Sequence, residues 1–162
     1  LERHPELGLV IIGYGELEDE LRAEVKHLGV EPFVVFAGRK THEEIGRYLR
    51  SCRVAVVPSI VDSRGETEGM PTVVVEALAS GTRVVGSRVD GIPDVIRHRE
   101  NGWLCREKDP EDLADQILLA LDEPDDSDVG RNSAATADGL DWSAVASHYA
   151  RVFGELAGAG GS

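Results

Sequence analysis

The sequence predicts an α/β fold in which parallel strands form a doubly wound sheet. Short apolar runs that end at glycine or proline alternate along the chain with segments of helical periodicity. Parallel neighbours in a sheet need a crossover connection, and the predicted helices supply one each time. The 162 residues, 41% of them hydrophobic and 29% charged, fit one globular domain with its own core. Any ligand is expected at the carboxyl ends of the strands.

The first part of the chain predicts two strand and helix pairs and then a third strand. Residues 9–12 are an apolar run that ends in a glycine-rich turn, as expected of a fully buried parallel strand. The next segment, 17–28, predicts a helix with one apolar face and an acidic first turn. Residues 33–36 predict the second strand, and 41–44 have the Thr-x-x-Glu spacing of a capping box that opens a helix. Residues 54–57 predict the third strand.

The segment 71–81 is ambiguous. Its three consecutive valines favour a strand, whereas the residues after them are typical of a helix. Gly81 suits the position just after a helix end, and proline suits the first position of a helix. We interpret the segment as a helix that starts at Pro71.

Two strands and two helices are predicted in the rest of the chain. The strands include residues 84–85 and 102–105. The Asp-Pro pair at 109–110 supplies an N-cap and a first-turn proline for one helix, and 143–156 predict a final amphipathic helix. Two tryptophans are expected to pack in the core or at its edge: Trp103 and Trp142.

Charge and cysteine content argue against several classes of partner. A formal net charge of −13 argues against nucleic acid and anionic membrane surfaces, since both require a basic face. No apolar run is long enough to span a membrane, and the first residues lack a signal-peptide layout. Cys52 and Cys105 lack the spacing of a zinc site or a disulfide framework. We therefore expect a soluble protein in the reducing cytoplasm.

A candidate anion site lies at the start of the helix predicted from Pro71. Proline at the first helical position has no N–H group to lose. The N–H groups of Thr72 and Val73 would point outward, where they and the helix dipole would hold a phosphate without a basic side chain. This suits a protein with so large an excess of acidic residues.

Two glutamates flank this helix start. Glu76 lies four residues after Thr72, on the same helix face, where its carboxylate would accept hydrogen bonds from both hydroxyls of a ribose. Glu68 precedes the turn and would reach the group attached to the phosphate, and Gly69 would let the backbone approach closely. From spacing alone, the alternative that both glutamates are surface carboxylates is as good.

The segment 68–76 resembles the Glu-x7-Glu signature of family four of the retaining GT-B glycosyltransferases. Further motifs of that family occur in the family's order over residues 7–121. They are Gly13-Tyr14-Gly15, Phe36-Ala37-Gly38, Val57-Pro58-Ser59, Val84-Val85-Gly86-Ser87, Asp90-Gly91-Ile92-Pro93-Asp94 and Asn101-Gly102-Trp103-Leu104. The ordered set makes the resemblance specific.

The resemblance implies a nucleotide diphosphate sugar as the donor substrate. It implies that Glu68 contacts the sugar ring and Glu76 the ribose, as the two residues of the catalytic site. It also implies retention of anomeric configuration, with no metal, no other cofactor and no protein nucleophile. Further contacts are implied for the sugar and pyrophosphate at Gly69, Met70, Pro71, Thr72 and Val73, and for the base and cleft at Gly38, Arg39, Lys40, Gly13 and Gly15.

The chain also departs from the family pattern. The segment that supplies an arginine and a lysine for the diphosphate has no counterpart here. We therefore expect residues 1–157 to be the Rossmann-like carboxyl-terminal half of a GT-B fold without its first strand and helix, and 158–162 to be a flexible tail. The amino-terminal, acceptor-binding domain is expected to be missing too. Such a chain would transfer little or no sugar alone, and its uncovered apolar surface would favour self-association.

Other functions stay open at this point. One is a different GT-B enzyme, such as a nucleotide-sugar epimerase, and another is a non-catalytic module that binds nucleotide sugar or a partner protein. The Asp-x-Asp at 126–128 fits a solvated linker better than a metal site, because no buried strand precedes it. A dinucleotide site at Gly13 is disfavoured, because Glu18 stands where the third glycine of that motif is required.

Overall fold

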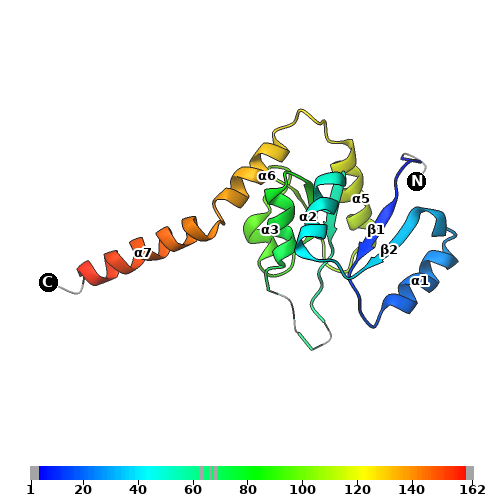
Figure 1. Ribbon diagram of the computed structural model, residues 1–162, viewed down its shortest axis with the longest axis horizontal. Coiled ribbons are helices and arrows are strands. Elements are labelled where there is room, and N and C mark those ends of the chain that lie inside the picture. Colours follow the sequence, from blue (N-terminus) through cyan, green and yellow to red (C-terminus); the bar gives the residue numbers. More distant parts are fainter. Residues whose placement is uncertain (1–3, 63, 66, 68, 160–162) are drawn as a thin grey trace. The chain divides into compact units, whose positions relative to one another are not determined.

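The computed structural model describes residues 4–62, 64, 65, 67 and 69–159, the last four of these by their backbone alone. The chain divides into two compact units, 1–45 and 46–162 (Figure 1). Each unit contains a parallel sheet flanked by helices, which confirms the predicted α/β class. The strands form two sheets where one was predicted, because local patterns identify strands without specifying their partners. The predicted tail at 158–162 lies partly outside the described residues and stays a prediction.

The first unit contains a two-stranded parallel sheet. Its elements are β1 (Leu9–Ile12), α1 (Glu18–His27), a short 3-10 helix η1 (Glu31–Phe33), β2 (Val34–Gly38) and the start of α2 (His42–Ser51). Leu9 lies opposite Val34 in the ladder. The predicted capping box opens α2: the backbone N–H of Thr41 donates to Glu44 Oε2 at 2.9 Å, and the N–H of Glu44 donates to Thr41 Oγ1 at 3.3 Å. The predicted strands and helix starts are confirmed to within a few residues.

The prediction that the first strand is fully buried is wrong. Leu9 is 51% exposed and Val10 is 43% exposed. Buried parallel strands require helices over both faces of the sheet, whereas no described helix makes extensive contact with β1. Self-association through the apolar surface of this unit remains a prediction. Its exposed apolar side chains are Leu9, Val10, Ile12, Tyr14, Leu17, Leu21, Leu28, Phe33 and Val35.

The second unit contains a three-stranded parallel sheet with the order β3-β4-β5. Its elements are β3 (Val54–Val57), α3 (Thr72–Ala79), β4 (Arg83–Ser87), α4 (Ile92–Val95), β5 (Trp103–Cys105), α5 (Pro110–Asp122), α6 (Val129–Asp138) and α7 (Trp142–Ala159).

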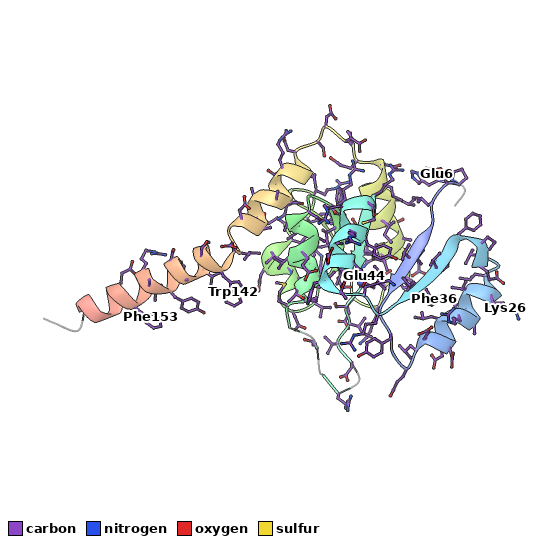
Figure 2. All side chains as sticks on the ribbon, in the orientation of Figure 1. Glu6, Lys26, Phe36, Glu44, Trp142 and Phe153 are labelled. Atoms are coloured by element: carbon purple, nitrogen blue, oxygen red, sulfur yellow. The ribbon has the colours of Figure 1, made fainter. Side chains whose placement is uncertain are left out.

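Burial of one helix face decides the ambiguous segment. Val74, Ala77 and Leu78 are fully buried at the i, i+3, i+4 spacing of a helix. This burial outweighs the strand preference of the valines, so 72–79 form a helix, as predicted. Trp103 is buried in the core, also as predicted. The prediction for Trp142 is wrong, because its side chain is 84% exposed at the start of α7 (Figure 2).

The helix α6 is not predicted by the sequence, because glycine, asparagine, serine and threonine are weak helix formers. It packs through small residues: Ser133 is fully buried and donates a hydrogen bond to the backbone carbonyl of Asn101. The Asn132 side chain donates to the carbonyl of Glu100 at 2.9 Å. Tertiary contacts therefore stabilise a helix that local propensity does not favour.

None of the described helices combines the length and the apolar character needed to span a membrane.

Candidate functional site

The start of α3 presents two open backbone amides. Pro71 is the N-cap residue and the helix begins at Thr72, so the predicted start at Pro71 is one residue too early. The carbonyl of Pro71 accepts a hydrogen bond from the N–H of Val74 at 3.0 Å. The N–H groups of Thr72 and Val73 have no acceptor within the part of the chain that the structure describes. As first-turn donors they are available to an anion.

Glu76 lies on the same helix, one turn after Thr72, with its side chain partly buried. Residues four apart lie on one helix face, so Glu76 lies on the same face of α3 as Thr72, one turn further along the helix. Glu68, the first glutamate of the predicted pair, lies outside the described residues. The geometry described at this site is therefore that of Glu76 and the helix start.

The turn before α3 has a backbone that favours glycine. Gly69 has φ +69°, in the left-handed region that other residues rarely adopt. Its N–H donates to Thr67 Oγ1 at 3.1 Å, and its carbonyl accepts from the N–H of Gly91 at 3.4 Å. These bonds hold the turn that delivers the chain to Pro71.

Gly91, in the loop after β4, supports this turn by close packing. A Cβ atom at Gly91 would lie 2.9 Å from Met70 Cε and 3.3 Å from Met70 Cβ. The sequence places Gly91 in a family motif but contains no signal for its contact with Met70. Two further supporting residues, Glu107 and Lys108, hold the backbone of Val61 and had no sequence signal at all.

Two of the predicted cleft glycines meet in the first unit. The N–H of Gly13 donates to the carbonyl of Gly38 at 3.0 Å, where β1 and β2 end. Both residues have positive φ, +136° for Gly13 and +65° for Gly38. Gly15 lies just before α1, and its carbonyl accepts from the N–H of Glu18 at 3.2 Å. The carboxyl edge of this sheet is therefore lined by backbone, with little side-chain cover.

The predicted base loop follows β2 directly. The guanidinium of Arg39 lies 5.4 Å from the centre of the Tyr14 ring, and Lys40 Nζ lies 4.0 Å from Glu44 Oε1. Beside them is an open hollow of about 520 Å³. It is lined by Arg39, Lys40, Thr41, His42, Glu44 and Ile45. The structure thus assembles the predicted residues as two groups, one within each unit.

The Asp-x-Asp segment lies on the turn between α5 and α6. Asp126 and Asp128 are exposed, and Asp128 is the N-cap of α6 and forms an ion pair with Arg131. This placement agrees with a solvated linker.

Comparisons with known proteins indicate one family. The family model described as "Glycosyl transferases group 1" matches residues 1–136. The amylovoran biosynthesis glycosyltransferase AmsK of Erwinia amylovora is 42% identical over 113 residues, which are 70% of this chain and 28% of AmsK. The chain spans about a third of the length of the curated relatives it matches.

Solved structures show the same fold. Sucrose-phosphate synthase from Thermosynechococcus elongatus matches with a TM-score of 0.77 and 25% identity, over 97% of this chain and 40% of that one. HepE of Anabaena in complex with UDP matches with a TM-score of 0.76 and 22% identity, over 93% and 42% of the two chains. The C-terminal domain of the group 1 glycosyl transferase LpcC from Francisella tularensis matches at 0.68 and 22%, over 85% and 71%. The fold is that of a GT-B carboxyl-terminal half-domain.

Proposed function

The chain belongs to the group 1 glycosyl transferases, and on that premise we propose that it is the donor-binding domain of a retaining enzyme. The natural full-length protein would transfer a hexose or pentose from a nucleotide diphosphate sugar to an acceptor. One observation carries the proposal: the open amides of Thr72 and Val73 lie at the start of α3, and Glu76 follows Thr72 by one turn on the same helix. Backbone amides suit a diphosphate, and a carboxylate suits the paired hydroxyls of a ribose.

The amides of α3 supply the chemistry that the leaving group needs. As the bond between sugar and phosphate breaks, negative charge grows on the departing diphosphate. The first-turn N–H groups and the helix dipole stabilise that charge without a side-chain cation. In the proposed reaction the acceptor hydroxyl attacks from the side that the diphosphate leaves and gives its proton to the departing phosphate oxygen. Configuration is therefore retained, and no protein nucleophile or metal takes part.

The other predicted residues have supporting roles in the proposal. Gly69 and Met70 shape the turn against the sugar and pyrophosphate, and Glu68 binds hydroxyls of the sugar ring. The loop 38–40 contacts the base and Gly13 and Gly15 line the cleft, largely through backbone atoms. We propose that acceptor binding, and further cations for the diphosphate, come from parts of the full-length protein outside this chain, which alone would be inactive. The proposed location is the cytoplasm.

A transfer assay tests the proposal. The natural full-length protein is incubated with a panel of nucleotide diphosphate sugars and candidate acceptors in EDTA, with UDP-sugars first because HepE was solved with UDP. Release of the diphosphate is followed, and NMR coupling constants give the anomeric configuration of the product. We expect one donor to react in EDTA with retention, and Glu76→Gln to slow the reaction while Glu111→Gln, a first-turn carboxylate of α5, does not. An inverted product, or a strict need for metal, would contradict the proposed mechanism.

A further inference from the structure

The connection from β3 to α3 is held by two side chains from the loop after β5. The backbone N–H of Val61 donates to Glu107 Oε1 at 2.9 Å, and Lys108 Nζ donates to the carbonyl of Val61 at 2.7 Å. Lys108 Nζ also lies 3.0 Å from Glu107 Oε1. Both backbone groups of one residue are therefore held by a charged pair, whatever side chain that residue has. We call Glu107 and Lys108 the clamp.

The charge state of the clamp supports these bonds. The Val61 N–H, and then the ammonium of Lys108, lower the pKa of Glu107 below its ordinary value. Glu107 is therefore ionised at neutral pH, and its hydrogen bond with Val61 is charge-assisted, the stronger kind.

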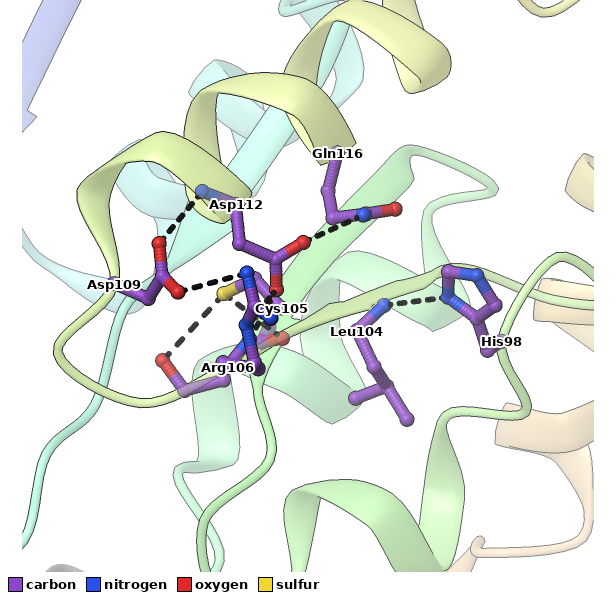
Figure 3. Close-up of polar contacts among 9 residues, drawn as sticks. His98, Leu104, Cys105, Arg106, Asp109, Asp112 and Gln116 are labelled. Carbon is purple, nitrogen blue, oxygen red and sulfur yellow. Dashed lines mark hydrogen bonds and ion pairs between the residues drawn. The ribbon is translucent and has the colours of Figure 1, made fainter.

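The clamp is built on a fixed turn. Asp112 Oδ2 accepts the backbone N–H of Arg106 at 2.6 Å, and Asp109 Oδ1 accepts the N–H of Asp112 at 2.9 Å (Figure 3). The Arg106 guanidinium also lies 2.8 Å from Asp109 Oδ2. These bonds attach the residues on both sides of the clamp to the first turn of α5. If the β3–α3 connection moves, the clamp therefore has little freedom to move with it.

Lys108 occupies a backbone position that suits glycine better. Its φ is +55°, in the left-handed region that residues with a Cβ atom adopt at a cost. The side chain of Lys108 contacts the carbonyl of Val61, which glycine at this position would not do.

We propose that Glu107 and Lys108 are positioning residues for the donor site. They fix the start of the β3–α3 connection at Val61, while Gly91 fixes its end at Gly69 and Met70, just before the open amides of α3. The inference rests on the proposed function. The clamp does not touch the donor; it acts by placing the backbone that does.

The expected effect is moderate. Loop entropy changes slowly with length, so freeing Val61 changes the closure probability of the connection by only about twofold. Loss of a hydrogen bond made by a charged group adds to this, and the exposed position of Lys108 reduces it. Together they predict a rise of about three- to tenfold in the KM for the donor.

The test uses Lys108→Gly in the natural full-length protein, with Arg99→Gly as the matched control. Both changes remove one exposed cation at a left-handed residue, since Arg99 has φ +66°, and Arg99 is not part of the clamp. Glycine relaxes both backbones, so neither variant should unfold. Steady-state kinetics, melting temperature and hydrogen exchange at Val61 are measured for each, and Lys108→Arg tests for rescue.

We expect Lys108→Gly to raise the donor KM and speed exchange at Val61 without lowering the melting temperature, and Arg99→Gly to do neither. If the wild type binds nucleotide sugar and the two glycine variants have the same donor KM, the positioning role of the clamp is contradicted. The proposed function is not contradicted by that result. A KM that rises only in step with a lower melting temperature would show a merely structural role and contradict it too. A wild-type protein that binds no nucleotide sugar would contradict the proposed function, and the inference would fall with it.

Discussion

Replacing Gly91 with alanine tests how closely the loop after β4 supports the donor turn. The backbone of Gly91, with φ −74° and ψ −7°, accepts alanine without strain. The new Cβ would meet Met70 at 2.9 Å from Cε and 3.3 Å from Cβ. The Cε atom ends a flexible side chain and moves aside at little cost, whereas Cβ moves only with the backbone of the Gly69–Met70 turn.

The size of the effect follows from these two contacts. Overpacking in a well-packed core costs about 1–3 kcal/mol. The part due to Met70 Cε is relieved by rotation, which leaves about 1 kcal/mol for the shift of the turn. Because the proposed binding of nucleotide requires the unshifted turn, this cost predicts a loss of nucleotide affinity of up to about fivefold. The hydrogen bond from Gly91 to Gly69 is already long at 3.4 Å, so its loss adds little.

Titration calorimetry and thermal unfolding of the full-length protein measure this prediction. Gly154→Ala is the control, because a Cβ there would meet no described atom within 4 Å apart from its chain neighbours and the adjacent backbone of its own helix. Met70→Gly in the Gly91→Ala background should return part of the lost affinity, since it removes both contacts, including the one with Met70 Cβ that rotation of the side chain does not relieve. Unchanged affinity in Gly91→Ala, or a double variant weaker than either single one, would refute the reasoning.

Two further predictions concern the stability of the second unit. The buried side chain of Asn101 donates to the carbonyl of Val95 at 2.9 Å and accepts a hydrogen bond from the N–H of Arg97 at 2.7 Å. Asn101→Ala should therefore lower the free energy of unfolding by about 2–4 kcal/mol. A decrease of less than about 1 kcal/mol, measured by urea denaturation, would contradict this prediction. Burial, and then two nearby arginines, lower the pKa of His98, whose Nδ1 accepts the Leu104 N–H at 3.1 Å (Figure 3). The neutral ring is the stable form in the fold, so its contribution is complete above pH 6.5 and is lost as the pH falls from 6.5 toward the lower folded pKa. Between about pH 7.5 and pH 5.5 the wild type should lose more stability than His98→Gln, and equal losses would exclude this contribution.

The sequence predicts well those parts of the fold whose signals are local. The capping box at Thr41 and the cap and proline at 109–110 are confirmed, because a helix start depends on a few adjacent residues. The helix α6 and the exposure of Trp142 could not be predicted, because both depend on which surfaces meet in the fold. Burial of Ser133 against the rest of the second unit holds α6 in place, and no residue pattern in 129–138 predicts this burial.

The candidate site divides in the same way. The open amides of Thr72 and Val73 follow from the position of a proline before a helix, which the sequence contains. Gly91 and the clamp of Glu107 and Lys108 lie 21 to 47 residues from their contacts at Met70 and Val61, and pairings over such separations cannot be identified in a single sequence. The residues proposed for the site therefore follow from local sequence patterns, whereas the residues that hold the site in place do not.

Binding of a nucleotide through Glu76 and the start of α3 is the central claim. The most direct test is calorimetric titration of UDP, GDP, ADP and dTDP into the natural full-length protein, with Glu76→Ala beside Glu111→Ala and with melting temperatures to confirm folding. We predict that one nucleotide binds selectively and that Glu76→Ala alone weakens it by about 1.5–3 kcal/mol, the value of a charge-assisted hydrogen bond. Absence of binding by any nucleotide, or equal affinities in the two variants, would contradict the claim.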